Sequence, residues 1–279
     1  MVKGREDVRT VGLRSGPILL GLLLVLAAGC ATVPVTGRQQ LALVPDRELV
    51  MMGADNYAQL MERSEIVTSG PEVDSVVRVG RRIAESTERF LVENGLENEV
   101  RAYDWQFNLI EDDAVNAFCM PGGRIGVYTG ILDVTRDDEG LAVVMAHEVA
   151  HAVAGHSNER MSQMLIAELG GTALSRALDE EPERTRQLAM AAYGLGAQVG
   201  VLLPYSRRHE SEADRIGLIL MARAGYDPRA AVPFWRRMAR EGGQTPPEFL
   251  STHPHPDTRI EDIETHLPEA IEIYERERS

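Results

Sequence analysis

The pattern of apolar and polar positions along the chain predicts helices accompanied by one small sheet. A polar residue at Asp46 opens a helix that continues to about Arg63, and apolar residues recur at helical spacing from Pro71 to Asn94. The segment from Trp105 to Ile110 alternates between apolar and polar residues, which is typical of a half-buried strand. These periods predict an α+β fold that is mainly helical.

A glycine pair predicts the turn of a β-hairpin. Gly122 and Gly123 separate two short runs of strand-forming residues, 117–120 and 124–128. The hairpin would complete the small sheet that the preceding strand begins.

The rest of the chain is predicted to be helical. A nearly all-apolar segment from about Asp138 to Gly155 belongs in the core. The segment from Met161 to Gly200, interrupted at 179–182, predicts a helical hairpin. We expect this hairpin to pack in the core, and covering a cleft or resting on a membrane are the alternatives. Further helices are predicted from Tyr205 to Ala222, from 228 to about Arg240, and from Glu261 to Arg278.

The apolar segment contains the most informative residues of the chain. His147, Glu148 and His151 form the pattern His-Glu-x-x-His, and a helix turns once in about 3.6 residues, so the two histidines share a face. Burying two imidazoles and a carboxylate among apolar neighbours is costly unless something binds them. The pattern therefore predicts a zinc site with Glu148 as general base. A pair of core histidines with ordinary hydrogen-bond partners is the alternative.

A hydrolytic zinc site needs a third protein ligand. The position six residues after His151 is a serine, so the ligand must come from elsewhere. In the helix that begins near Tyr205, Glu210 and Asp214 share a face, whereas Glu212 lies about 200° round the helix from Glu210. Glu210 is thus the better candidate ligand, and Asp214 is a candidate acceptor that orients a histidine. A solvated acidic helix start is the alternative.

These residues resemble metallopeptidase family 48, which includes the HtpX, BepA and Oma-type zinc proteases. The resemblance rests on His-Glu-x-x-His, on Glu-x-x-x-Asp at 210–214, and on two further blocks at 116–132 and 250–260. It implies a mainly helical zincin of the gluzincin type, with the small β-sheet beside the active-site helix. It also implies one Zn²⁺ per chain, with Glu210 as the third ligand.

The two further blocks contain candidate substrate and catalytic residues. Asn116, Ala117 and Phe118 lie in the strand segment before the active-site helix, where an extended substrate could pair as an added strand. A hairpin that only completes the sheet is the alternative. Prolines restrict the loop that carries His253, which could stabilise a developing oxyanion or cap the vacant metal position. The resemblance implies the capping role, and a purely structural loop is the alternative.

The predicted chemistry is hydrolysis of a peptide bond. Zinc held by His147, His151 and Glu210 would activate a water molecule, and Glu148 would deprotonate that water for attack on a peptide carbonyl. Glu148 would then return the proton to the leaving amine.

Several residues near these motifs receive lesser roles. Arg207 matches a family position and is expected to pair with Asp214. The other histidines, His156, His209 and His266, are expected at the surface or at helix ends.

The N-terminus resembles a bacterial lipoprotein signal. Basic residues precede an apolar run from Pro17 to Ala28 that is too short to span a bilayer, and the run leads into Leu26-Ala-Ala-Gly-Cys30. We expect a signal peptide over 1–29, lipidation of Cys30, a tether over 30–45 and a peptidase domain over 46–279. Ala31 after the cysteine favours the outer membrane, facing the periplasm. An uncleaved short anchor and a plain signal peptide are the alternatives.

Composition narrows the choice of partners. The formal net charge is −14, and the first 29 residues carry four basic and two acidic side chains, so the remainder is near −16. This charge argues against nucleic acid or an anionic membrane as a binding surface. Cys119 is the only cysteine besides Cys30, so no disulfide framework is expected.

The expected substrates are unfolded or misassembled envelope proteins. A lipid-anchored, chaperone-like holdase with latent proteolysis is the alternative. A cytosolic metal-storage protein conflicts with the N-terminal signal and with Glu148.

Overall fold

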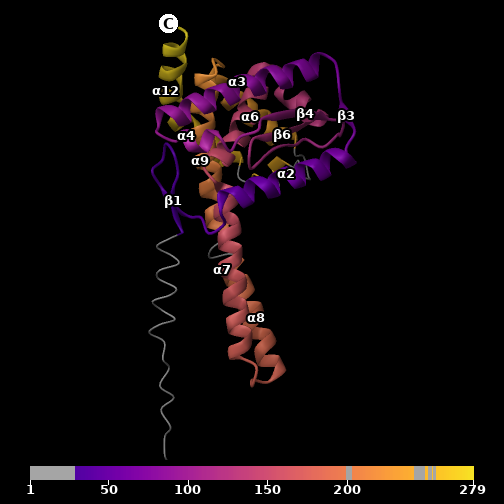
Figure 1. Ribbon diagram of the computed structural model, residues 1–279, viewed down its shortest axis with the longest axis vertical. Coiled ribbons are helices and arrows are strands. Elements are labelled where there is room, and N and C mark those ends of the chain that lie inside the picture. Colours follow the sequence, from indigo (N-terminus) through magenta and orange to yellow (C-terminus); the bar gives the residue numbers. More distant parts are fainter. Residues whose placement is uncertain (1–28, 199–202, 242–248, 251–252, 254–255) are drawn as a thin grey trace, which may run out of the picture.

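The computed structural model describes residues 29–198, 203–241, 249–250, 253 and 256–279, and helices dominate it (Figure 1). This confirms the predicted α+β class. The strands are β1 (Cys30–Thr32), β2 (Gln39–Leu41), β3 (Ile66–Val67), β4 (Gln106–Ile110), β5 (Ala117–Met120) and β6 (Arg124–Tyr128). The helices are α2 (Asp46–Arg63), α3 (Pro71–Glu93), α4 (Glu97–Val100), α5 (Leu132–Thr135), α6 (Asp138–Val153), α7 (His156–Ala177), α8 (Glu183–Ala197), α9 (Leu203–Arg223), α10 (Ala231–Glu241) and α12 (Pro256–Glu277).

The predicted hairpin forms the end of a four-stranded sheet with the order β3-β4-β6-β5. β5 and β6 pair antiparallel. In the turn that joins them, Gly122 and Gly123 have φ of 92° and 84°, values that residues other than glycine rarely adopt. β4 pairs parallel with β6, so the two strands need a crossover connection. The strand order places β5 at one edge of this sheet and β3 at the other.

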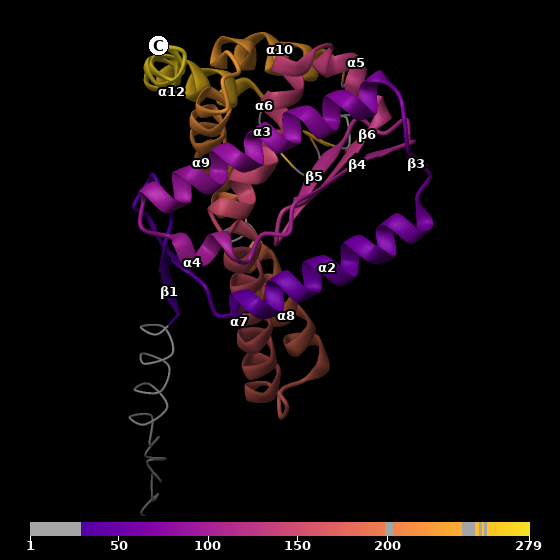
Figure 2. The same cartoon turned by 45° about the horizontal axis from the view of Figure 1, so that its top comes forward.

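Two helices cover the faces of the sheet, as Figure 2 shows with α3 on one side and α2 on the other. Tyr57 of α2 donates from its hydroxyl to the carbonyl of Ile125 in β6, 3.0 Å away. On the other face, α3 approaches β4 so closely that a Cβ at Gly80 would lie 2.3 Å from the ring of Phe107. The sheet is thus held between helices, while β5 also contacts α6.

Helix α6 lies at the centre of the core, as its apolar sequence predicts. Asp137 caps its first turn by accepting a hydrogen bond from the Gly140 amide at 2.8 Å. α9 packs along α6, and a Cβ at Gly217 would lie 3.1 Å from the His147 backbone. Because glycine has no side chain, the two helices approach closely beside the His-Glu-x-x-His motif.

The α7–α8 pair confirms the predicted helical hairpin, but the expectation that it packs in the core is wrong. The hairpin projects from the body of the molecule (Figure 1), and no residue of α8 is buried. Its apolar residues do not gather on a single face that could bury against the core. Across the described ranges, no helix combines the length and apolar content needed to cross a bilayer. The exposed large apolar residues of the hairpin are Met164, Leu165, Ile166, Leu169, Leu188 and Leu195.

Residues 29–45, here called the N-terminal arm, are more ordered than the tether that the sequence predicts. β1 and β2 pair antiparallel within the arm, and Val33 is buried. The Leu43 amide donates to Ser162 of α7 at 2.8 Å, and the Gln40 side chain donates to the Ala154 carbonyl at 2.7 Å. The arm is therefore packed against the start of α7 by specific hydrogen bonds.

Candidate active site

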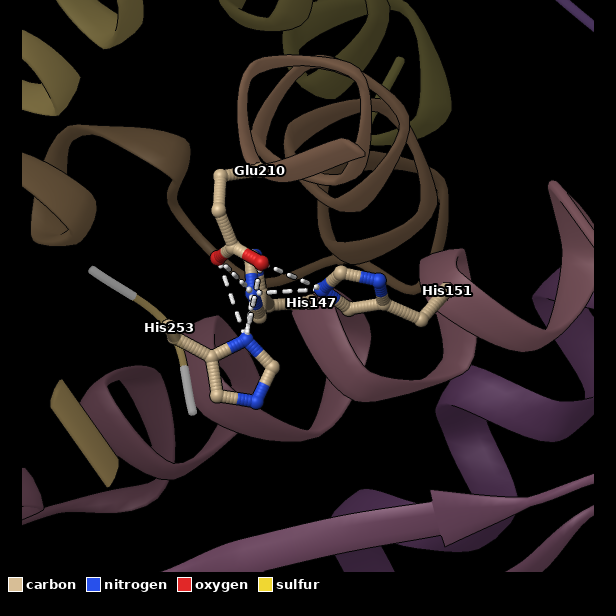
Figure 3. A group of neighbouring side chains, drawn as sticks. All are labelled: His147, His151, Glu210 and His253. Carbon is tan, nitrogen blue, oxygen red and sulfur yellow. Dashed lines mark hydrogen bonds and ion pairs between the residues drawn. The ribbon is translucent and has the colours of Figure 1, made fainter. Parts of the chain in front are cut away.

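Four side chains from three parts of the chain converge between α6 and α9 (Figure 3). His147 and His151 extend from one face of α6, and their Nε2 atoms are 3.1 Å apart. Glu210 of α9 places its carboxylate 3.4 Å from Nε2 of His147 and 3.5 Å from Nε2 of His151. His253 directs Nδ1 at the same carboxylate, 3.0 Å away.

The residues present fit a divalent metal ion. One nitrogen or oxygen atom from each of His147, His151, Glu210 and His253 lies within 4.8 Å of the others, and all four residues are buried. Imidazole nitrogens with one carboxylate oxygen are ligands that suit Zn²⁺. So many polar groups are costly to bury among apolar helices unless they bind something.

Glu148 lies beside this group without belonging to it. Glu148 is 4% exposed, and among the described residues its Oε1 atom has no hydrogen-bond partner, although Nε2 of His253 is 3.4 Å away. Burial raises the pKa of the Glu148 carboxyl, and Glu210 adds to this effect while His253 and His147 oppose it. A buried carboxylate with an unused oxygen and a raised pKa is suited to accept a proton.

Asp214 lies beside His147 and also contacts Arg259. Oδ1 of Asp214 is 3.0 Å from Nδ1 of His147, on the ring edge opposite the ligand group. Arg259 donates to Asp214 Oδ2 at 2.8 Å and to Oδ1 at 2.5 Å, and its guanidinium lies 3.5 Å from the centre of the Trp235 ring. Arg207, in contrast, is exposed. Arg259 lies within the 250–260 block, so a signal for it was present in the sequence.

The pKa values of His147 and His151 are shifted in opposite directions. Burial and Arg259 lower the pKa of His147, but hydrogen bonds to Asp214 and Glu210 outweigh them and raise it to about 9. Burial lowers the pKa of His151 well below its ordinary value, despite the nearby charge of Glu210. Burial also opposes ionisation of Glu210, yet the surrounding histidines hold its pKa well below the usual range. Glu210 is therefore ionised, as a metal ligand must be.

Two histidines that the sequence assigns to the surface or to helix ends are buried, and His156 is the first residue of α7. His156 is 1% exposed and His209 is 2% exposed, and their rings stack with centroids 4.2 Å apart. Gly155, with φ of 67°, turns the chain between α6 and α7, so His156 returns toward His151. Helical spacing could not show this contact, because the helix is interrupted between the two residues. His266 is half-buried on α12.

The predicted substrate residues lie at the edge of the sheet nearest α6. Asn116 directly precedes β5, and Ala117 and Phe118 begin it. Ala117 is buried, and the Phe118 ring contacts Tyr57 and Tyr128 edge-on. The side chains of Ala117 and Phe118 thus pack within the protein. Cys30, the predicted lipidation site, is exposed at the start of β1.

The chain is similar to several metalloendopeptidases. It is 32% identical to metalloendopeptidase OMA1 of Danio rerio over 87% of this chain and 51% of that protein. It is 42% identical to mitochondrial metalloendopeptidase OMA1 of Schizosaccharomyces pombe over 60% of this chain and 48% of that protein. The putative beta-barrel assembly-enhancing protease of Vibrio cholerae is 31% identical over 79% of this chain and 44% of that protein. The chain thus spans about half the length of these relatives.

A family model matches most of the chain. The model of Peptidase family M48 matches residues 79–267, which include α6, α9 and all four residues of the ligand group. The match confirms, at the level of the family, the expectation of a metal-dependent peptidase. This chain therefore belongs to Peptidase family M48.

Proposed function

We propose that this chain is a zinc-dependent endopeptidase of the bacterial cell envelope that cleaves misfolded or misassembled envelope proteins. The observation that carries the proposal is the convergence of His147, His151 and Glu210 beside the buried carboxylate of Glu148. Two bacterial relatives are named beta-barrel assembly-enhancing proteases, one of them as putative, which supports the envelope as the location.

In this proposal, His147, His151 and Glu210 hold the zinc ion. Bound zinc would polarise the peptide carbonyl and lower the pKa of a water molecule. Glu148 would take the proton of the attacking water on its buried carboxylate and deliver it to the leaving amine. Asp214 and Arg259 keep His147 oriented, because the carboxylate accepts from Nδ1 and leaves Nε2 directed at the ligand group.

His253 is proposed to cap the fourth metal position in this arrangement of the chain. Its Nδ1 atom is 3.3 Å from Nε2 of His147 and 3.0 Å from Glu210, so His253 could serve as a fourth protein ligand to an ion held by this group. A catalytic zinc site keeps one position for water. Turnover therefore requires His253 to leave this position to a water molecule. Nε2 of His253 is 3.4 Å from Glu148, so His253 is also close enough to the general base to stabilise the developing oxyanion.

A proteolysis assay tests the proposed function against the holdase alternative. We expect the zinc-loaded chain to cleave casein and an unfolded outer-membrane protein, and a chelator to stop cleavage until zinc is restored. Mass spectrometry of the fragments would identify the cleaved bonds. Binding without cleavage under every metal condition would favour the holdase and reject the peptidase.

Substrate is proposed to bind as an added strand along β5. β5 pairs with β6 on one side, and among the described residues no strand pairs with its other edge, where backbone groups could pair with any sequence. We expect a peptide-based inhibitor in a crystal structure to pair with residues 116–120. A complex in which the peptide lies away from β5 would contradict this prediction.

The chain is proposed to be attached to the outer membrane, facing the periplasm, through lipid on Cys30. The exposed position of Cys30 would leave its side chain accessible at the start of the arm. We expect mass spectrometry of the protein from a bacterial envelope to find an N-terminal, lipidated Cys30. A Cys30→Ser variant should appear in the soluble fraction, and an unmodified Cys30 in the mature protein would reject the anchor.

A further inference from the structure

A buried polar network lies behind His151, on the side away from the ligand group. Nδ1 of His151 is 2.8 Å from Nδ1 of His156, and Nε2 of His156 is 3.1 Å from Oε2 of Glu212. His209 stacks on His156 and donates from Nε2 to Glu159 at 2.8 Å. All these side chains are buried. The chain of contacts therefore runs from a candidate metal ligand to a carboxylate of α9.

The N-terminal arm provides the positive charge of this network. Arg38 donates to Oε2 of Glu212 at 2.8 and 3.0 Å, and to the two oxygens of Glu159 at 2.9 and 2.7 Å. Thr36 also donates to Glu212. Without Arg38, two buried carboxylates would lack their cation, which is strongly unfavourable. The arm precedes residue 79, so it lies outside the segment that the family model matches.

The chemistry of the groups determines which atom donates and which accepts in each hydrogen bond of this network. An ionised carboxylate only accepts, so the contact with Glu212 requires a proton on Nε2 of His156. A neutral histidine has one ring proton, so Nδ1 of His156 must accept. Nδ1 of His151 must then donate to it, which leaves the lone pair of His151 on Nε2. Nε2 is the atom that faces His147 and Glu210.

We propose that Glu212 and Arg38 are positioning residues for the metal site. Arg38 holds Glu212 in place, and Glu212 fixes, through His156, which nitrogen of His151 faces the metal. The inference rests on the proposed function, because it assigns His151 as a metal ligand. The two ligand histidines are then oriented in different ways: His147 by direct contact with Asp214, and His151 through an intervening histidine.

The first test is the ring tautomer of His151 in the full-length, metal-free chain. Long-range ¹H–¹⁵N NMR spectra distinguish a protonated ring nitrogen from one that carries the lone pair. We expect His151 to be neutral, with its proton on Nδ1, and we expect Glu212→Gln to abolish this single tautomer because an amide can donate as well as accept. A proton on Nε2 of His151 in the wild-type chain would overturn the inference.

The second test is the affinity for zinc, measured by competition with a chromophoric chelator. Loss of a group that orients a metal-binding histidine lowers affinity by about 10–100-fold, and we expect this loss for Glu212→Gln. Arg38→Met should weaken binding in the same direction. With Co²⁺ in place of zinc, both variants should show altered visible absorption, which reports ligand geometry. Glu269→Gln removes an exposed carboxylate that pairs with Arg215 and is the matched control.

The outcomes separate positioning from a purely structural role. Lower melting temperatures with wild-type zinc affinity and an unchanged Co²⁺ spectrum would confine Glu212 and Arg38 to folding and overturn the inference. If a variant fails to fold, the tautomer of the wild-type chain still decides the question. Failure of the wild-type chain to bind zinc would reject the proposed function, whereas the tautomer measurement needs no metal.

Discussion

Replacing Glu148 with glutamine is expected to leave zinc bound and to lower kcat for peptide hydrolysis by about 10²–10⁴-fold, the usual contribution of a general base. The amide keeps the shape of the side chain but cannot take the proton of the attacking water. Glu148 is not among the four groups that converge on the metal position, so its replacement should not remove the ion. Turnover of a fluorogenic peptide, alongside the metal content by mass spectrometry, measures both effects.

The matched control for this variant is Glu139→Gln, on the same helix. Glu139 lies in the first turn of α6 and is exposed, so its replacement should change neither turnover nor zinc content. A Glu148→Gln chain that retains zinc and cleaves peptides at the wild-type rate would contradict the role of Glu148 as general base. Loss of zinc together with activity would place Glu148 in metal binding instead.

Replacing Glu210 with alanine is expected to remove zinc as well as activity. The Glu210 carboxylate provides the only negative charge within the ligand group, and it lies within 3.5 Å of His147, His151 and His253. Loss of this ligand should weaken zinc binding by more than the roughly 10–100-fold that follows loss of an orienting hydrogen bond. Competition with a chelator, followed by the activity assay at saturating zinc, measures the loss.

Glu269→Ala provides the control for this variant. Glu269 forms an exposed ion pair with Arg215 of α9, so its removal tests whether any loss of a carboxylate bonded to this helix reduces zinc binding. We expect wild-type zinc content from this variant, since exposed ion pairs contribute little to stability. A Glu210→Ala chain that binds zinc with wild-type affinity would reject Glu210 as a ligand and leave His253 as the third.

The hydrophobic pattern predicted the local structure well, because each element carries its own periodicity. The ranges of α2, α3, β5 and β6 agree with the prediction within one residue, and the glycine pair marks the turn between the two strands. α9 was also predicted, from its charged opening and apolar remainder. The expectation that α7 and α8 pack in the core was wrong for a physical reason. Alanine and leucine favour helix whether or not the helix packs against another element.

Contacts between distant segments were less predictable. Arg259 is 45 residues from Asp214 in the chain, and Arg38 is 174 residues from Glu212, so no spacing rule connects them. His156 reaches His151 only because Gly155 turns the chain between two helices. These residues share the property that their partners lie on other elements.

By itself, the sequence determined that two histidines and a glutamate share the centre of an apolar helix, since a fixed helical period places them there. It also determined that Glu210 and Asp214 face the same way and that Glu212 faces elsewhere. Only the tertiary structure decided what these groups meet: Glu210 reaches the histidines, Asp214 meets Arg259, and Glu212 joins the N-terminal arm. The reason is that a helical period fixes direction within one element, whereas the packing of elements fixes which partner lies in that direction.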